Sequence, residues 1–197
     1  EKIYLDVKFE DWKRIEYKRQ EALDLGVLIS YPGDAVPAKI TYNNKIYNSD
    51  IRLKGKWLDH LESDKWSLKV DLKGENTILG MRRFSLQAPE RRKYLNEFFY
   101  LSALKKEDVL ALRYEFVEVF INGERKGIYA LEENFRKELV ESNERREGVI
   151  IEFSDENFWE KIKGGDITIG QLSNNDEWFL TSKINVYDSE VVLSDPT

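Results

Sequence analysis

The 197-residue sequence contains no cysteine and a single histidine, His60. The absence of cysteine excludes a disulfide framework, a thiolate zinc site and a cysteine nucleophile. With one histidine, a zinc site built from several histidines would need a second chain, and a Ser-His-Asp triad could use only His60. No apolar run approaches the roughly 20 residues that a bilayer-spanning helix needs. These absences exclude several large classes of enzyme and membrane protein.

The sequence also lacks an excess of basic residues and any leader-like segment. It has 31 Lys and Arg against 37 Asp and Glu, a formal charge of −6, which argues against a nucleic-acid-binding domain. It begins at Glu1 with no charged segment followed by an apolar one, so we expect that a leader was removed or that the chain is part of a longer protein.

The 13% of aromatic residues argues against disorder, and the length suffices for one core without metal or disulfide.

Hydrophobic periodicity predicts a chain of short strands with a few helices. Asn43-Asn44 and Asn122-Gly123 tolerate positive φ and predict two tight hairpins. The predicted strands cover residues 3–7, 39–42, 45–47, 49–54, 65–72, 83–88, 114–121, 127–132 and 148–153. The predicted helices cover residues 10–25, 89–106 and 134–142. We therefore expect an α+β domain, an antiparallel sheet with helices packed on one face, at residues 1–153. Residues 154–197 are expected to be a linker or the start of a second lobe.

The alternation along the middle strands predicts which face is buried. Apolar residues of 65–72 and 83–88 point one way and their polar neighbours the other. We expect the helix 89–106 to pack on the apolar face, which carries Trp66, Leu68, Phe84 and Leu86. Its own buried stripe is predicted to be Tyr94, Leu95, Phe98, Phe99 and Leu101 or Ser102.

The opposite face of the same strands is predicted to be basic in an otherwise acidic protein. Arg52, Lys54, Lys69 and Arg83 share it if the apolar residues face the core. Such a face could hold phosphates through ammonium charges and forked guanidinium donors. An antiparallel sheet also commonly leaves one polar face in water, and the residues alone do not separate these two interpretations.

Four other features have a structural interpretation that the sequence favours over a functional one. His60 lies beside Asp59 and could form an acid/base pair, but a solvated loop histidine is the commoner case. Glu132-Glu133 could bind a metal, but neighbours on a strand point to opposite faces, so a strand end meeting water is favoured. Asp155-Glu156-Asn157 and Gly164-Gly165 are interpreted as a polar loop and a simple turn.

Four stretches together resemble the CotH family of spore-coat and cell-surface protein kinases, which have an atypical kinase fold. The most specific is the run from Tyr114 to Glu132, with Glu118-Val119-Phe120-Ile121-Asn122-Gly123-Glu124 followed by Gly127-Ile128-Tyr129-Ala130-Leu131-Glu132. The others are Ile51-Arg52-Leu53-Lys54-Gly55, Lys65-Trp66-Ser67-Leu68-Lys69-Val70 and Leu79-Gly80-Met81-Arg82-Arg83-Phe84-Ser85-Leu86. Their order and spacing extend the resemblance over residues 51–155.

This resemblance implies ATP- and Mg²⁺-dependent phosphorylation of Ser or Thr on secreted or surface proteins of unknown identity. The sheet would then be the N-terminal lobe of the kinase. In protein kinases a strand lysine neutralises the nucleotide phosphates and is held by a helix glutamate. We expect Lys69 in that role, Lys54 as second choice and Glu97 as the partner, with Arg52 and Arg83 as neighbouring nucleotide-binding cations. Otherwise Glu97 would pair with Lys93 on its own helix.

The sequence departs from the family pattern in two places. The segment after Gly55, from Lys56 to His60, is bulky where the family has small polar residues suited to a phosphate loop. The family's Asn-x-Asp and Asp-Phe-Asp motifs lie beyond the matched part, and Asn174-Asn175-Asp176 lacks the helical context. We therefore assign no catalytic or metal-binding residue and expect the 197-residue chain alone to transfer no phosphate.

Two other functions remain open at this point. The first is a non-catalytic binding or scaffolding module that retains the kinase-like lobe. The second is a carbohydrate- or peptide-binding sheet face, suggested by Trp57, Trp66, Trp159 and Trp178. Because indole rings more often fill cores, the sequence favours the first alternative over the second.

Overall fold

The computed structural model describes residues 1–146, 148–154, 159, 161 and 182–187. The chain divides into two compact units, Glu1–Glu144 and Arg145–Thr197, whereas the sequence placed the boundary after residue 153. The predicted features at Asp155-Glu156-Asn157, Gly164-Gly165, Asn174-Asn175-Asp176 and Trp178 lie outside the described residues.

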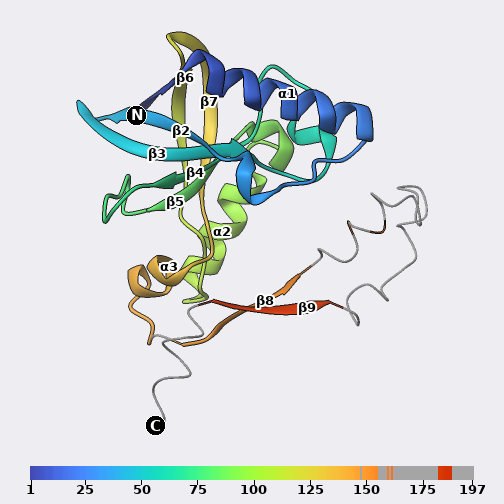
Figure 1. The fold of residues 1–197 in the computed structure, drawn as a ribbon. Helices are drawn as coiled ribbons and strands as arrows, with labels where there is room; N and C mark the ends of the chain where they lie inside the picture. Colours follow the sequence, from blue (N-terminus) through green and yellow to red (C-terminus); the bar gives the residue numbers. More distant parts are fainter. Residues whose placement is uncertain (147, 155–158, 160, 162–181, 188–197) are drawn as a thin grey trace. The chain divides into compact units, whose positions relative to one another are not determined.

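Unit Glu1–Glu144 is built around a closed barrel of seven strands (Figure 1). The order around the barrel is β1-β2-β3-β4-β5-β7-β6. Its first strand pairs antiparallel with the second and parallel with the sixth, which closes the barrel, and every other pairing is antiparallel. The strands are β1 (Lys2–Val7), β2 (Val36–Tyr42), β3 (Lys45–Leu53), β4 (Leu68–Leu72), β5 (Arg83–Gln87), β6 (Tyr114–Ile121) and β7 (Glu124–Glu133).

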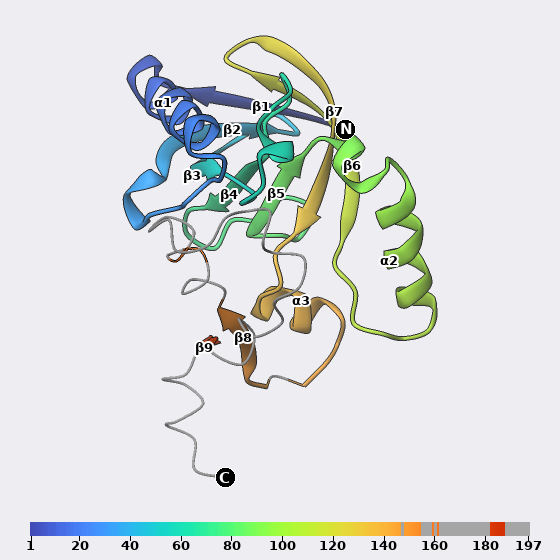
Figure 2. The same ribbon diagram turned by 90° about the vertical axis from the view of Figure 1, so that its right-hand side faces the viewer.

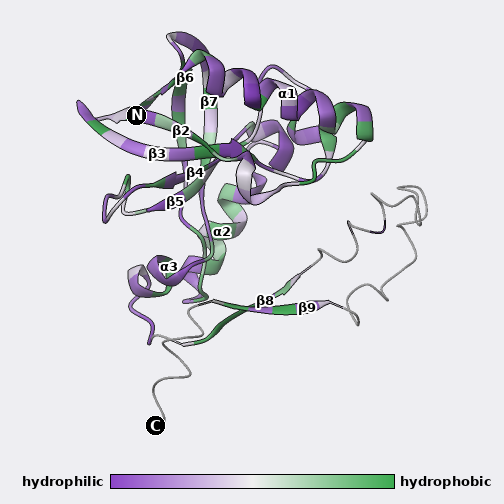
Figure 3. Cartoon of the chain, viewed as in Figure 1, coloured by the Kyte–Doolittle hydropathy of each residue, from purple (hydrophilic) through white to green (hydrophobic). Residues whose placement is uncertain are grey.

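The barrel corrects the predicted fold class. An α+β sheet with its helices packed on one face is wrong, because the two sheet edges are joined through β1 and β6 and the apolar face becomes the barrel interior. That interior is filled by alternate residues of the strands, such as Leu68, Val70, Phe84 and Leu86, all fully buried. The alternation is visible in Figure 3, where hydrophilic and hydrophobic residues follow one another along β3.

Two hairpins form where the sequence predicts them. Asn43 and Asn44 connect β2 to β3 with φ of 48° and 60°. Asn122 and Gly123 connect β6 to β7 with φ of 50° and 83°. Such left-handed pairs match the twist of the flanking strands, so the local sequence fixes the register of both hairpins.

Helix α1 (Phe9–Leu25) begins two residues after β1 and contributes to the barrel core. Ile15 and Ala22 are its buried residues, and the helix packs mainly on β2 and β3. It ends at Gly26, whose φ of 85° lets its N–H donate to the carbonyl of Ala22. The predicted helix 10–25 is therefore confirmed.

Helix α2 (Asn96–Lys106) packs on the outside of the barrel, on the side away from α1 (Figure 2). Its Leu101 joins Tyr114 and Ala130 in a small outer core, with Phe98 partly buried against them. The expected packing on the face of Leu68 and Phe84 is wrong, because that face lines the closed interior.

The predicted single helix 89–106 is also wrong in its first half. Pro89–Arg92 form the 3-10 helix η3, and Lys93 and Tyr94 then adopt φ of 49° and 60°, which ends it. As a result Tyr94, Leu95 and Phe99, expected in the buried stripe, are exposed. Helix α3 (Lys137–Ser142) follows β7.

In unit Arg145–Thr197, the described strands β8 (Ile150–Ser154) and β9 (Lys183–Tyr187) form an antiparallel ribbon. Strand β8 lies within two residues of the predicted strand 148–153. The ribbon pairs Ile151 with Val186 and Phe153 with Ile184.

Candidate functional site

One row of polar side chains crosses the outer face of the barrel from β3 to β6. The strand registers place Arg52 opposite Lys69, Lys69 opposite Ser85, Ser85 opposite Glu132, and Glu132 opposite Tyr114. All point away from the interior because their neighbours on each strand fill it. The row is basic at its β3–β4 end and acidic at β7.

Lys54 lies at the centre of this face, one residue after β3. Its Nζ is 3.0 Å from Glu132 Oε2 and donates to Gln87 Oε1 at 3.3 Å. Gln87 Nε2 in turn donates to the same Glu132 oxygen. The side chains of Lys54 and Glu132 are only 21% and 14% exposed. We call Lys54, Gln87 and Glu132 the Lys54 cluster; it holds an ammonium group in one place with little solvent around it.

The backbone on either side of Lys54 is fixed by the connection between β3 and β4. The Lys54 N–H donates to the Ser67 carbonyl at 2.8 Å, and Gly55 then turns the chain with a φ of 94°. A side chain on Gly55 would place Cβ 2.3 Å from the ring of His60. His60 Nδ1 lies 2.9 Å from Ser67 Oγ, and Leu61 is fully buried in the barrel core. The bulky segment Lys56–His60 thus belongs to a packed connection.

His60 is buried, so the expectation of a solvated histidine is wrong. Burial is the main cause that lowers the pKa of its imidazole, and the charges of Lys54, Arg92 and Arg91 lower it further while Asp59 opposes them. Arg91 and Arg92 belong to η3, which begins two residues after Gln87. Lys54, Arg91 and Arg92 therefore lie close enough to the His60 ring to affect its charge.

The other predicted cations of the site have partners of their own. Arg52 donates to Ser30 Oγ at 2.9 Å, and burial lowers the pKa of its guanidinium while Asp34 opposes the shift. Arg83 forms a 2.9 Å ion pair with Asp71, its neighbour across β4 and β5. The structure thus places all four predicted cations on one outer face, with Lys54 alone joined to Glu132.

Glu97 lies in the first turn of α2 and forms no ion pair with Lys54, Lys69 or Lys93. Its charge acts on Tyr114, whose pKa is raised to about 12, mainly by burial and then by Glu132 and Glu97. A side-chain hydrogen bond with Gln87 opposes part of this shift, so the buried Tyr114 hydroxyl lies beside the Lys54 cluster.

Sequence reasoning missed Glu132 and Gln87 as members of this cluster. Glu132 closes the most specific stretch of the family resemblance, but nothing local relates it to Lys54, 78 positions earlier. The alternation of β5 does put Gln87 on the face of Ser85, and β7 puts Glu132 on the same face. The alternation along each strand indicates that both side chains point outward. Only the pairing of β5 with β7 shows that Gln87 and Glu132 come together.

Glu133 has a structural role on the opposite side of β7. It is 2% exposed and forms an ion pair with Arg113, whose Nε donates to Glu133 Oε2 at 2.9 Å. The backbone N–H of Arg113 donates to the same oxygen, and its guanidinium also donates to the Leu79 and Gly80 carbonyls. The interpretation of Glu132-Glu133 as a strand end in water is therefore wrong, although the two do point to opposite faces.

The described residues contain neither a metal-binding cluster nor a membrane-spanning helix. No group of three His, Cys, Asp or Glu side chains there could hold a metal ion. No helix within those residues has the length and apolarity to cross a membrane.

The chain matches the model of a known protein family. The model of the family described as CotH kinase protein matches residues 51–178, more than half of the chain. That segment includes Lys54, Gln87 and Glu132. No curated protein matches the chain. Since the family match covers the strands that carry the Lys54 cluster, as well as the run from Tyr114 to Glu132, the chain belongs to the CotH kinase family.

Proposed function

We propose that this barrel is the nucleotide-binding part of a protein kinase and that Lys54 neutralises the phosphates of ATP. The whole protein would transfer the γ-phosphate to Ser or Thr hydroxyls of secreted or cell-surface proteins, as the family resemblance implies. The observation that carries the proposal is the ion pair of Lys54 with Glu132 at 3.0 Å. In protein kinases a strand lysine acts on the phosphates while a carboxylate holds it in position.

The surroundings of Lys54 support a phosphate ligand. Lys54, Arg91 and Arg92 act on the same His60 ring, with Asp59 opposing them. The Nε of Arg91 is buried without a partner among the described residues. Phosphate oxygens accept charge-assisted hydrogen bonds from such groups. The described residues therefore fit the phosphates of a nucleotide.

The described residues do not fit the Mg²⁺ that accompanies ATP in such reactions. They contain no group of three carboxylate or imidazole side chains near enough to one another to bind a metal. The part of the reaction assigned to this barrel is the binding and orientation of the nucleotide phosphates.

Nucleotide titration of the chain with a fluorescent ATP analogue tests the assignment. Lys54→Ala removes one charge-assisted bond to phosphate and should weaken binding roughly tenfold or more. Arg125→Ala is the control, because Arg125 lies beyond the hairpin tip and is paired with Glu118. Thermal melts of each variant separate a loss of binding from a loss of folding. Equal affinities for the two variants would remove Lys54 from the site.

The variant Lys69→Ala tests the lysine that the sequence favoured for neutralising the nucleotide phosphates. Lys69 lies in the same row, opposite Arg52 and Ser85, so it can contribute to the same phosphates. A loss for Lys69→Ala that exceeds the loss for Lys54→Ala would assign the principal role to Lys69. Failure of every variant to change affinity, or no nucleotide binding at all, would favour the non-catalytic binding module.

Phosphoryl transfer is tested with labelled ATP, Mg²⁺ or Mn²⁺ and a serine-rich acceptor. We expect no labelling by the 197-residue chain, because transfer needs metal ions that bridge the phosphates as well as cations that bind them. Labelling above that of the Lys54→Ala variant would show a catalytic centre that the described residues do not reveal.

A further inference from the structure

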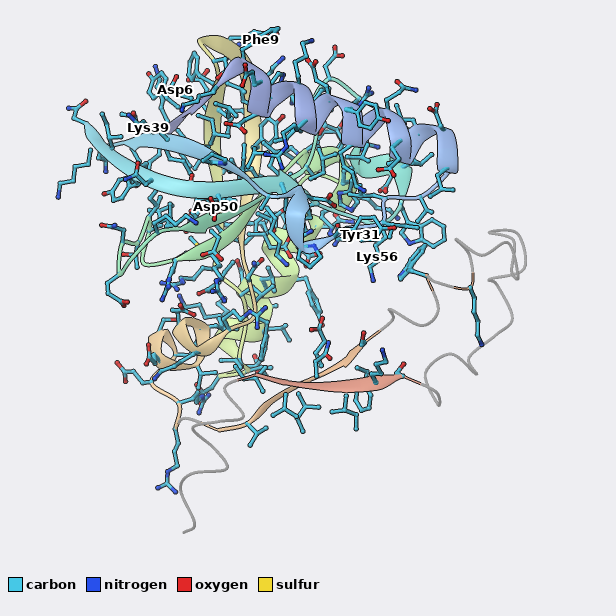
Figure 4. The ribbon with its side chains drawn as sticks, in the orientation of Figure 1. Asp6, Phe9, Tyr31, Lys39, Asp50 and Lys56 are labelled. Atoms are coloured by element: carbon cyan, nitrogen blue, oxygen red, sulfur yellow. The ribbon has the colours of Figure 1, made fainter. Side chains whose placement is uncertain are left out.

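A pocket lies at the end of β1, where the chain enters α1. It has a volume of about 810 Å³ and shares no lining residue with the Lys54 cluster. Small-molecule sites in proteins commonly have volumes of roughly 300–1,000 Å³ and mostly apolar walls with a few polar groups. Figure 4 labels Asp6, Phe9 and Lys39 at this end of the barrel.

The apolar wall of the pocket comes from three segments that meet here. Val7 ends β1, Phe9 and Trp12 belong to the first turn of α1, and Pro37 and Ala38 begin β2. The Phe9 residue is 73% exposed at the rim of the pocket. Lys13 Nζ lies 5.5 Å from the centre of that ring. A ligand with an apolar body would cover Phe9 and remove this surface from water.

The charged groups of the pocket are mainly positive. Lys8, Lys39 and Lys73 line it, against one carboxylate, Asp6. Lys73 is paired with Asp50, whereas Lys8 and Lys39 form no ion pair with any described residue. Asp6 is opposite Lys39 in the β1–β2 register but is not within ion-pair distance of it. In a protein of net charge −6, this lining is complementary to an anion.

Asn122 adds a neutral donor whose orientation is fixed. Its Oδ1 accepts a hydrogen bond from the Val7 N–H at 2.8 Å, so the amide cannot be flipped. Its Nδ2 group donates to no described residue. The pocket therefore offers two ammonium groups that pair with no described carboxylate and one oriented amide beside an apolar wall.

We propose that this pocket binds a small amphipathic anion, an aromatic or aliphatic body that carries a carboxylate, sulfonate or phosphate group. The body packs against Phe9 and Pro37, and Lys8 and Lys39 bind the anionic group. The inference is independent of the kinase proposal, because it rests on residues that lie apart from Lys54.

Fluorescence titration of the full chain with 8-anilinonaphthalene-1-sulfonate tests this proposal. The uncharged N-phenyl-1-naphthylamine, which has the same rings without the sulfonate, serves as the second probe. The double variant Lys8→Gln/Lys39→Gln should weaken sulfonate binding at least about tenfold, since each charge-assisted contact contributes a factor of this order. The same variant should leave the uncharged probe within about twofold, and Phe9→Ala should weaken both probes.

Three matched controls make the result specific. Lys45→Gln/Lys106→Gln removes the same net charge from exposed positions outside the pocket and should leave the sulfonate affinity unchanged. Lys54→Ala should also leave the sulfonate affinity unchanged. A loss in this variant would mean that the probe binds at the Lys54 cluster and not in the pocket. Phe99→Ala tests the exposed ring on α2 and should have no effect. Absence of saturable sulfonate binding, equal weakening by either lysine pair, or loss of binding in Lys54→Ala or Phe99→Ala would each overturn the proposal.

Discussion

At the residue scale, the two neighbouring carboxylates Glu132 and Glu133 show how one strand serves two purposes. Glu132 points outward and joins Lys54, whereas Glu133 joins Arg113 and is almost fully buried. Alternation along a strand makes this division possible. What alternation cannot supply is the partner of each carboxylate, because Arg113 and Lys54 come from other parts of the chain.

Glu133→Ala should lower the free energy of unfolding by about 3 kcal/mol, the lower end of the cost of breaking a buried ion pair. The lower end applies because Arg113 is 24% exposed and retains its bonds to the Leu79 and Gly80 carbonyls. Urea unfolding monitored by tryptophan fluorescence measures the change. The control Glu118→Ala breaks the exposed pair with Arg125 and should change stability far less, since water screens it. Equal losses in the two variants would contradict the structural role of Glu133.

His60 should make the stability depend on pH in a defined window. Burial lowers the pKa of its imidazole below the ordinary 6.5, and Lys54, Arg92 and Arg91 add to the shift. As the pH falls, the unfolded chain therefore binds a proton before the folded chain does. The contribution is fully present above pH 6.5 and is lost as the pH falls from 6.5 toward the folded-state pKa.

Urea unfolding at pH 7.5 and at pH 5.5 measures this effect. Wild-type protein should lose more stability between these values than His60→Gln does, because most carboxylates titrate at lower pH. The glutamine side chain can still bond to Ser67, so the two proteins differ mainly in the titrating group. The same pH dependence in both proteins would show that His60 is not the source.

At the scale of elements, the sequence predicts the turns and helix ends that neighbouring residues determine. It does not predict features that depend on contacts between distant parts of the chain. The Asn43-Asn44 and Asn122-Gly123 hairpins and α1 with its Gly26 cap form as expected, because each is specified within a few residues. The break at Lys93 and Tyr94 was missed, since neither residue is a usual helix breaker. It places α2 against Tyr114 and Ala130 instead of continuing η3.

The same division applies to the candidate site. The strand pattern alone put Arg52, Lys54, Lys69 and Arg83 on one face, and the structure agrees. The pattern could not distinguish Lys54 from Lys69, because the distinction depends on β5 pairing with β7. It also could not show that the segment after Gly55 is held by His60, Leu61 and Ser67.

The connection between β3 and β4 should tolerate no side chain at Gly55. Gly55→Ala combines a positive φ with a Cβ that would lie 2.3 Å from the His60 ring. Gly123→Ala has nearly the same φ, 83°, but no atom within 4 Å of the new Cβ. It should therefore cost only the backbone strain, roughly 1–3 kcal/mol. Thermal unfolding of both variants should show the larger loss for Gly55→Ala, together with weaker nucleotide binding. Equal losses would mean that the loop moves aside without displacing Lys54.

At the scale of the whole molecule, closure of the barrel is the feature that sequence patterns did not reveal. Strand β1 is the connection between β2 and β6, and its parallel pairing with β6 joins residues more than 110 positions apart. The alternation of apolar and polar residues along a strand is the same at the edge of an open sheet as in a closed barrel. The alternation along β1 therefore could not show that this strand closes the sheet into a barrel.

Deletion of residues 1–7 should consequently abolish cooperative folding of unit Glu1–Glu144. Ile3 and Leu5 are fully buried, and their loss would open the core between β2 and β6. The two strands would also become unpaired edges, which favour association between chains. Size-exclusion chromatography and urea unfolding should show aggregation and a broad transition. The matched control is Tyr4→Ser in the full chain, which removes the outward ring stacked on Phe120 and leaves the pairing of β1 intact. It should elute at the same volume as the unaltered full chain and unfold in one sharp step. A deleted chain that behaves in the same way would mean that β1 covers the core without being needed to close it.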